Sequence, residues 1–186
     1  MAHVLKTLVS VFVFVTCLSQ SYAQSKDSCY QSLRFRYFSS SCNPNVVRAC
    51  SIADSILSLD TFWLEIRNSI RQRITNSTYT MRQLADSLQV YKGVTDISLF
   101  PEQDEGRVIA ITSRANQIDI YKAGLDQSVL NLALTLIHEW VHSVDYGLNP
   151  DNLQFAHRRP QFPFWNRNTA SYRFQKIAID LMSQEK

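Results

Sequence analysis

The chain has 186 residues, of which 45% are hydrophobic, 11% aromatic and 19% charged, with 4 Gly and 5 Pro. This length predicts one domain, or one domain with a processed leader. The apolar content excludes collagen-like, low-complexity and wholly disordered chains, because it is enough to build a core. The formal net charge is +3, and the basic residues form no stripe interleaved with aromatic residues. We therefore expect no nucleic-acid partner.

The first 23 residues have the pattern of a secretory signal peptide. Lys6 supplies one positive charge, residues 7–18 are an apolar run, and Ser21 and Ala23 are small residues at the two positions that a signal peptidase reads. The run is shorter than the roughly 20 residues that a membrane-spanning helix needs. The sequence thus predicts cleavage after Ala23 and one mature domain over 24–186. It also predicts a secreted or periplasmic location, without stable membrane insertion. The alternative is an uncleaved N-terminal anchor.

Three cysteines, Cys29, Cys42 and Cys50, lie near the start of the mature chain. In an oxidising compartment two of them can form a disulfide, leaving the third free. Their spacing does not select the pair, and it matches no CxxC metal-binding pattern. Asn76 begins a sequon for N-glycosylation, which has meaning only in a host that glycosylates.

The first half of the mature chain reads as helices followed by strands. Residues 24–43 are rich in serine and are expected to be irregular. Apolar residues at helical spacing then predict three helices, Pro44–Leu59, Thr61–Ile74 and a short one from Thr80 to Val90. The second is expected to have Asp60 as its N-cap and Ile70 on its apolar face. Three β-branched segments follow and predict a small, antiparallel sheet, made of Val94–Phe100, Arg107–Thr112 and Gln117–Tyr121.

The most pronounced helical pattern is Gln127–Asp145, preceded by Asp126 as N-cap. It is almost continuously apolar and is therefore expected at the centre of the fold. Gly147 and Pro150 are predicted to end it, Gly147 by adopting a left-handed conformation. A long loop over 149–169 and a final helix from Ala170 to Met182 complete an α+β fold.

The chemistry lies in this central helix, where residues 138–142 read HExxH. Because side chains at i and i+4 share one helix face, His138 and His142 can both reach one Zn²⁺ at about 2.0–2.1 Å. Glu139 follows the first histidine and can accept a proton from a water molecule that zinc activates. The motif predicts a zinc site with Glu139 as general base.

The stretch from Gln117 to Asp145 resembles the strand-plus-helix core of the zincin superfamily of zinc metallopeptidases. His138, Glu139 and His142 match the motif of that superfamily residue by residue. The resemblance implies a Zn²⁺ cofactor and a peptide or protein substrate, held as an added strand on an edge strand beside the helix. The glutamate-ligand helix of thermolysin-like members has no counterpart here. Metzincins would have glycine at 145 and histidine at 148, where this chain has Asp145 and Leu148, so that subfamily is excluded.

The third metal ligand has several candidates. His157, in the loop after the helix, would complete a His₃ site of the catalytic kind. Asp145 shares the face of the two histidines and could ligate the metal or hydrogen-bond a ligand histidine. Asp151 and Asp180 are further carboxylates that could serve. The expected metal ligands are His138, His142 and His157.

Tyr172 could stabilise an oxyanion with its hydroxyl, or be a half-buried tyrosine of the core. Two interpretations compete with a secreted zinc metallopeptidase. HExxH could be a chance sequence on a core helix, or the chain could be a zinc-stabilised secreted binding module with a zincin fold and no turnover.

Overall fold

The structure is a computed structural model and describes residues 27–103, 105–106, 108–151, 153–155 and 168–184. These residues form six helices and a five-stranded sheet, which confirms the α+β class. The strands are β1 (Asp27–Gln31), β2 (Phe35–Ser39), β3 (Thr95–Phe100), β4 (Ala110–Arg114) and β5 (Gln117–Tyr121). The helices are α2 (Pro44–Ser58), α3 (Asp60–Arg67), α4 (Met81–Gln89), α5 (Lys122–Leu125), α6 (Val129–Leu148) and α8 (Ala170–Gln184). The predicted signal peptide lies outside the described residues.

The sheet is mixed, so the prediction of an antiparallel sheet was wrong. Its strand order is β1-β2-β3-β5-β4. The outer pairs β1–β2 and β4–β5 are antiparallel, whereas β2–β3 and β3–β5 are parallel. The parallel pairing arises because the chain passes from β3 to the far edge of the sheet, forms β4 there, and turns back so that β5 fills the space between.

The prediction that residues 24–43 are irregular was also wrong, because β1 and β2 form a hairpin within this segment. The side chains of Phe35 and Tyr37 are buried, and Arg36 between them is less buried. This alternation is the period of a half-buried strand, and the surrounding serines obscure it in the sequence. The disulfide joins Cys29 of β1 to Cys42 after β2, and Cys50 is a free thiol buried in α2.

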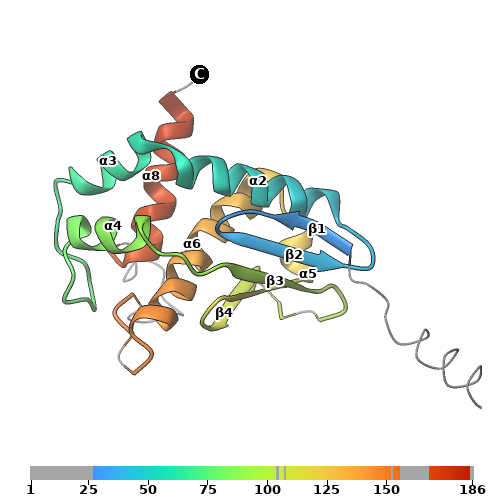
Figure 1. Ribbon diagram of the computed structural model, residues 1–186. Coiled ribbons are helices and arrows are strands. Elements are labelled where there is room, and N and C mark those ends of the chain that lie inside the picture. The colour runs from blue at the N-terminus through green and yellow to red at the C-terminus, as the bar shows by residue number, and fades with distance from the viewer. Residues whose placement is uncertain (1–26, 104, 107, 152, 156–167, 185–186) are drawn as a thin grey trace, which may run out of the picture.

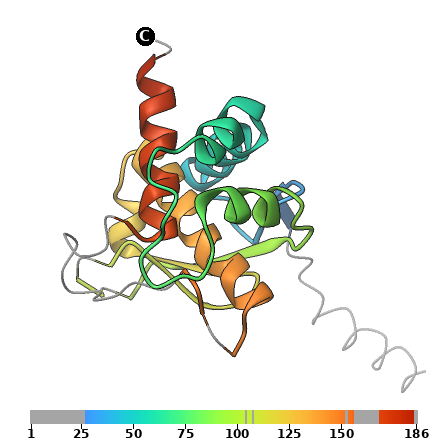
Figure 2. The same cartoon turned by 90° about the vertical axis from the view of Figure 1, so that its left-hand side faces the viewer.

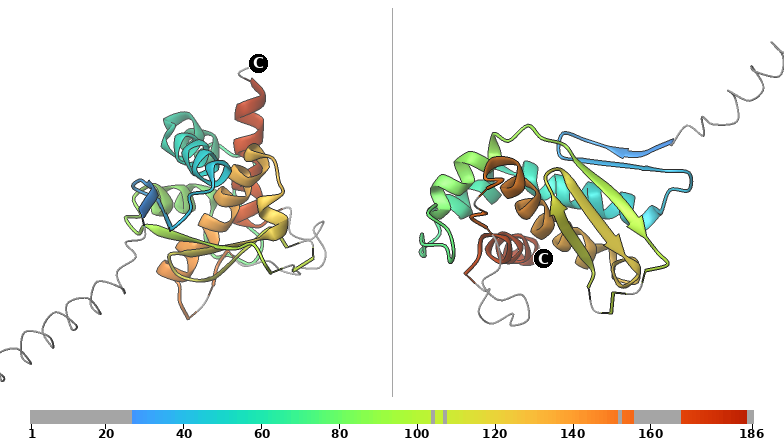
Figure 3. Two further views of the ribbon diagram at one scale, coloured as in Figure 1. Left: turned by 90° about the vertical axis from the view of Figure 1, so that its right-hand side faces the viewer. Right: turned by 90° about the horizontal axis from the view of Figure 1, so that it is seen from below.

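The helices form a layer on one face of the sheet. Figure 1 shows α2 running across β1 and β2, with α6 crossing behind it towards β4. Seen edge-on in Figure 3, the sheet has α2, α6 and α8 on the same side. In Figure 2 the last helix, α8, lies alongside α6, with which it packs. A single cluster of buried apolar residues connects β2, β3 and β5 with α2, α3, α4, α6 and α8.

Local capping explains where two predicted helices begin. The side chain of Asn43 accepts hydrogen bonds from the N–H groups of Asn45 and Val46, and Pro44 occupies the first position of α2. Thr80 and Gln83 form a reciprocal capping box at the start of α4. Both helices follow the prediction to within one residue at each end.

Helix α3 is shorter than predicted and ends at Arg67 instead of Ile74. Phe62, Trp63 and Ile66 are buried as expected, but the side chain of Ile70 is 101% exposed. Without a buried apolar residue at this position, no packing contact supports a further turn. The chain continues as a loop from Asn68.

Helix α6 begins and ends later than predicted. Ser128, and not Asp126, is its N-cap, and accepts a hydrogen bond from the N–H of Asn131 at 3.2 Å. Gly147 does not end the helix in a left-handed conformation, because α6 continues to Leu148. A side chain at 147 would instead collide with the hydroxyl of Tyr91. Glycine is present there for close packing.

No helix within the described residues is long and apolar enough to cross a lipid bilayer.

Candidate metal site on helix α6

Core packing fixes the rotation of α6 and so the direction of the motif residues. Trp140 and Val141 are fully buried, and the Trp140 ring packs edge-on against Trp63 of α3, with centroids 6.5 Å apart. Ser143 is also buried, and its hydroxyl forms a 3.2 Å hydrogen bond with the hydroxyl of Thr95 on β3. With these residues in the core, the other face of the helix carries the histidines.

His138 and His142 lie side by side on this face. Their ring centroids are 5.1 Å apart, as expected one turn apart on a helix. His138 is 7% exposed and His142 is half-buried. The structure thus places two of the three predicted ligands, His138 and His142, side by side and partly shielded from solvent.

Tyr172 of α8 contacts the first histidine. Its ring packs edge-on against His138, with centroids 4.7 Å apart and planes at 86°. Burial raises the pKa of the Tyr172 phenol, and the negative charge of Glu139 raises it further. Tyr172 is half-buried, as expected for a tyrosine of the core, and its ring also contacts the HExxH motif. Its hydroxyl therefore stays protonated at neutral pH beside both His138 and Glu139.

Glu139 lies next to the histidine pair and is half-buried. Burial raises the pKa of its carboxyl to about 7, and hydrogen bonding by Thr112 acts in the opposite direction. The hydroxyl of Thr112, on β4, also donates to the main-chain oxygen of Glu139 at 2.9 Å. A carboxyl with a pKa near neutrality can both take and return a proton.

The strand at the sheet edge beside α6 is β4. Within the described residues β4 pairs with β5 only, whereas β5 lies between β3 and β4. Gln117–Tyr121, the strand that precedes the helix in sequence, is therefore internal and cannot take an added strand. Figure 3 shows β4 at the rim of the sheet next to α6, and the two elements are in contact.

Asp145 anchors the loop that follows α6. Its carboxylate accepts hydrogen bonds from the side chain of Asn149 at 2.9 Å and from the N–H groups of Gln154 at 3.0 Å and Phe155 at 2.7 Å. Asp145 is 1% exposed, and burial raises the pKa of its carboxyl although these three bonds act against the rise. Both oxygens are thus engaged by the loop, which does not favour Asp145 as a metal ligand.

The remaining candidates for the third ligand lie apart from His138 and His142 or fall outside the described residues. His157 falls outside the described residues. Asp151 is exposed on a turn. Asp180 binds Lys176 at 2.8 Å and lies eight residues beyond Tyr172, about 12 Å along the axis of α8. Among the described residues no three of His, Cys, Asp or Glu are placed to hold a metal ion.

The two histidines are nevertheless compatible with a zinc site that takes its third protein ligand from outside the described residues. Two imidazoles one helical turn apart are the paired donors that zinc accepts in catalytic sites, where a third protein ligand completes the set. Glu139 is beside them and not needed as a ligand. His138, His142 and one further donor would hold the metal.

The sequence did not reveal the contacts that Thr112 and Asp145 make at this site. Thr112 reaches Glu139 only because β4 lies at the sheet edge, and a threonine in a strand carries no signal of this. Asp145 was predicted on the histidine face, but its loop partners come from residues up to ten positions away.

Comparison with known proteins gives no relative. No protein-family model, curated protein or solved structure matches this chain. A zincin fold and a peptidase activity therefore stay predictions that rest on the site residues alone.

Proposed function

We propose that this chain is a zinc metallopeptidase that hydrolyses peptide bonds in a peptide or protein substrate outside the cytoplasm. One observation carries this proposal. His138 and His142 lie with ring centroids 5.1 Å apart on α6, with Glu139 beside them and next to the edge strand β4. Glu139 and His142 are less buried than their neighbours Trp140 and Val141, and His138 is 7% exposed.

His138 and His142 would hold the zinc ion, with His157 as the third ligand. When bound, zinc supplies a Lewis acid that lowers the pKa of water to about 7 and polarises a carbonyl. Asp145 fixes the loop that leads towards residue 157, because both of its carboxylate oxygens bind that loop. We assign Asp145 this structural role.

Glu139 would act as the general base and then as the general acid. Its carboxylate takes the proton of the attacking water and delivers it to the nitrogen of the leaving amine. One carboxyl can serve in both steps, because it first accepts a proton and then returns it. General acid–base groups typically contribute about 10²–10⁴-fold to rate.

Tyr172 and β4 would hold the substrate. The Tyr172 hydroxyl, kept protonated by its raised pKa, can donate to the carbonyl oxygen of the scissile bond as negative charge develops there. An extended peptide can pair through main-chain hydrogen bonds with the edge of β4 that no described strand occupies.

The location outside the cytoplasm is supported by the Cys29–Cys42 disulfide, since disulfides persist in oxidising compartments. The sequence pattern of residues 1–23 points the same way. Cleavage after Ala23 would give a mature protein that begins at Gln24, which N-terminal sequencing of the exported protein would detect.

Zinc content tests the metal site. We expect about one zinc per mature chain in the wild type by elemental analysis, and loss of that zinc in His138→Ala and in His142→Ala. Tyr172→Phe is the matched control, because it alters a neighbour of His138 that is not a proposed ligand. A wild-type chain that binds no zinc after incubation with the metal would contradict the proposal.

The third ligand is tested by comparing two variants. His157→Ala should weaken zinc binding more than Asp145→Asn does. The reverse order would place the third ligand at Asp145. If the wild type binds zinc and no peptide is cleaved, the chain is the zinc-stabilised binding module, and the peptidase proposal is wrong.

A further inference from the structure

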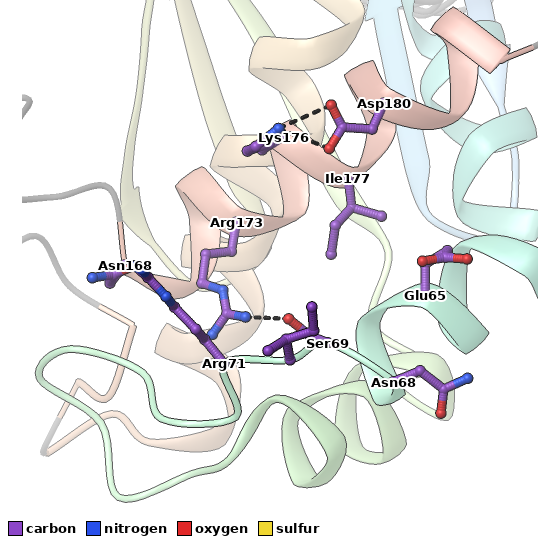
Figure 4. A pocket seen from close by; sticks show the side chains of 10 residues that line it. Glu65, Asn68, Ser69, Arg71, Asn168, Arg173, Lys176, Ile177 and Asp180 are labelled. Carbon is purple, nitrogen blue, oxygen red and sulfur yellow. Dashed lines mark hydrogen bonds and ion pairs between the residues drawn. The ribbon is translucent and has the colours of Figure 1, made fainter.

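A separate cavity lies between α3 and α8. Its volume is about 460 Å³, and none of the motif residues of α6 lines it. Figure 4 shows the last turn of α3 and the following loop on one side and α8 on the other. Sites for small molecules have volumes of about 300–1,000 Å³, so the cavity is large enough to hold one.

Arg173 of α8 is held in this cavity by uncharged groups. Its guanidinium donates to the main-chain oxygen of Arg73 at 3.3 Å and to the hydroxyl of Ser69. These acceptors orient the half-buried side chain but do not neutralise it. Burial lowers the pKa of Arg173, and the positive charge of Arg71 lowers it further. The guanidinium is thus a partly desolvated cation beside a second cation.

The other charges that line the cavity do not compensate this pair. Lys176 and Asp180 bind each other at 2.8 Å. Within the described residues neither Arg71 nor Arg173 forms an ion pair with a carboxylate. In the view of Figure 4, Arg71 and Arg173 lie at the opposite end of the cavity from Glu65. One end therefore carries two positive charges that no described acidic residue pairs.

The chemistry of that end suits an oxyanion. A guanidinium presents a planar fork of N–H donors that matches the oxygens of a carboxylate or a phosphate. Asn168 also lines the cavity, on the side of the two arginines in Figure 4, and its amide is a neutral donor. Apolar surface adjoins the cations, because Ile70 is fully exposed on the loop and Ile177 is half-buried on α8.

We propose that this cavity binds a small organic anion, whose carboxylate or phosphate head pairs with Arg71 and Arg173 and whose short apolar body contacts Ile70 and Ile177. This site needs neither zinc nor Glu139, so it does not depend on the proposed peptidase activity. The proposed site also gives a role to Ile70, whose side chain is exposed to solvent and is not part of the core.

The test is isothermal titration calorimetry of the mature protein with hexanoate and with hexyl phosphate. We expect at least one probe to bind with a dissociation constant of about 1 mM or lower. Arg71→Gln should weaken binding by about tenfold or more, because hydrogen bonds to a charged group are each substantial. Arg71 is exposed and makes no described ion pair, so this variant should fold. Arg82→Gln removes an equally exposed arginine of α4 that does not line the cavity, and should bind as the wild type does.

The relative affinities of the two probes, and one further titration with inorganic phosphate, refine the result. Whichever of the two probes binds more tightly identifies the head group. Inorganic phosphate should bind more weakly than hexyl phosphate, because it lacks the apolar body, and equal affinity would overturn the assignment of Ile70 and Ile177. Absence of binding by both probes at about 10 mM, or equal binding by wild type and Arg71→Gln, would overturn the proposal as a whole.

Discussion

Tyr172 meets His138 edge-on across the interface of α8 and α6, with ring centroids 4.7 Å apart. This contact joins two segments that are far apart in sequence, and it places a protonated phenol next to the residues proposed to hold zinc. A phenol in this position could donate a hydrogen bond to a developing oxyanion.

Replacement of Tyr172 by Phe tests this role. We expect kcat to fall by about 10²-fold or more, the effect of losing one donor to a developing oxyanion, with KM almost unchanged. Zinc content should stay the same, because the phenol is not a proposed ligand. Steady-state kinetics on a peptide that the wild type cleaves would measure both constants.

The matched control for this variant is Tyr121→Phe. Tyr121 is the last residue of β5, and its ring packs against Phe100 with centroids 5.8 Å apart. Equal loss of kcat in both variants would show that the phenol of Tyr172 has no specific role.

Asp145→Asn should destabilise the protein without removing zinc. The carboxylate accepts three hydrogen bonds, and an amide nitrogen in place of one oxygen would face N–H donors. We expect the free energy of unfolding of the metal-free protein to fall by about 1–3 kcal/mol, measured by chemical denaturation. Asp151→Asn, at an exposed turn, should change it by less than about 0.5 kcal/mol. Loss of zinc with unchanged stability would instead identify Asp145 as a ligand.

Cys50 should be unreactive in the native protein. Burial raises the pKa of its thiol to about 12, so at pH 8 the thiol stays protonated and the nucleophilic thiolate is scarce. Mass spectrometry after treatment with iodoacetamide should show no adduct on the native mature chain and one on the unfolded, non-reduced chain. Alkylation of the native chain at Cys50 would contradict the burial, and more than one adduct on the unfolded chain would contradict the Cys29–Cys42 disulfide.

Features set by neighbouring residues could be predicted from the sequence. The helical spacing of apolar residues identified α2, α4 and α8, and the cap residues Asn43 and Thr80 marked where two of these helices begin. The central helix was found for the same reason, and its HExxH motif requires only that the segment be helical.

Features set by distant residues could not be predicted. The position of β5 between β3 and β4 depends on a crossover that no local pattern encodes, and so does the identity of β4 as the edge strand. The early end of α3 depends on whether Ile70 finds a buried surface, which only the assembled core decides. Likewise, the contact of Thr112 with Glu139 exists only after the sheet and helix pack together.

The proposed role of Glu139 is tested by the rate at which the zinc-loaded mature chain cleaves a broad peptide library, compared with the rate of its Glu139→Gln variant. The amide keeps the shape of the side chain but cannot accept the proton of the attacking water, so the variant should retain zinc and lose about 10²–10⁴-fold in rate. Glu102→Gln, an exposed carboxyl after β3, should cleave like the wild type, and a chelator should abolish cleavage by both. Cleavage that is undiminished in Glu139→Gln would show that Glu139 is not the general base.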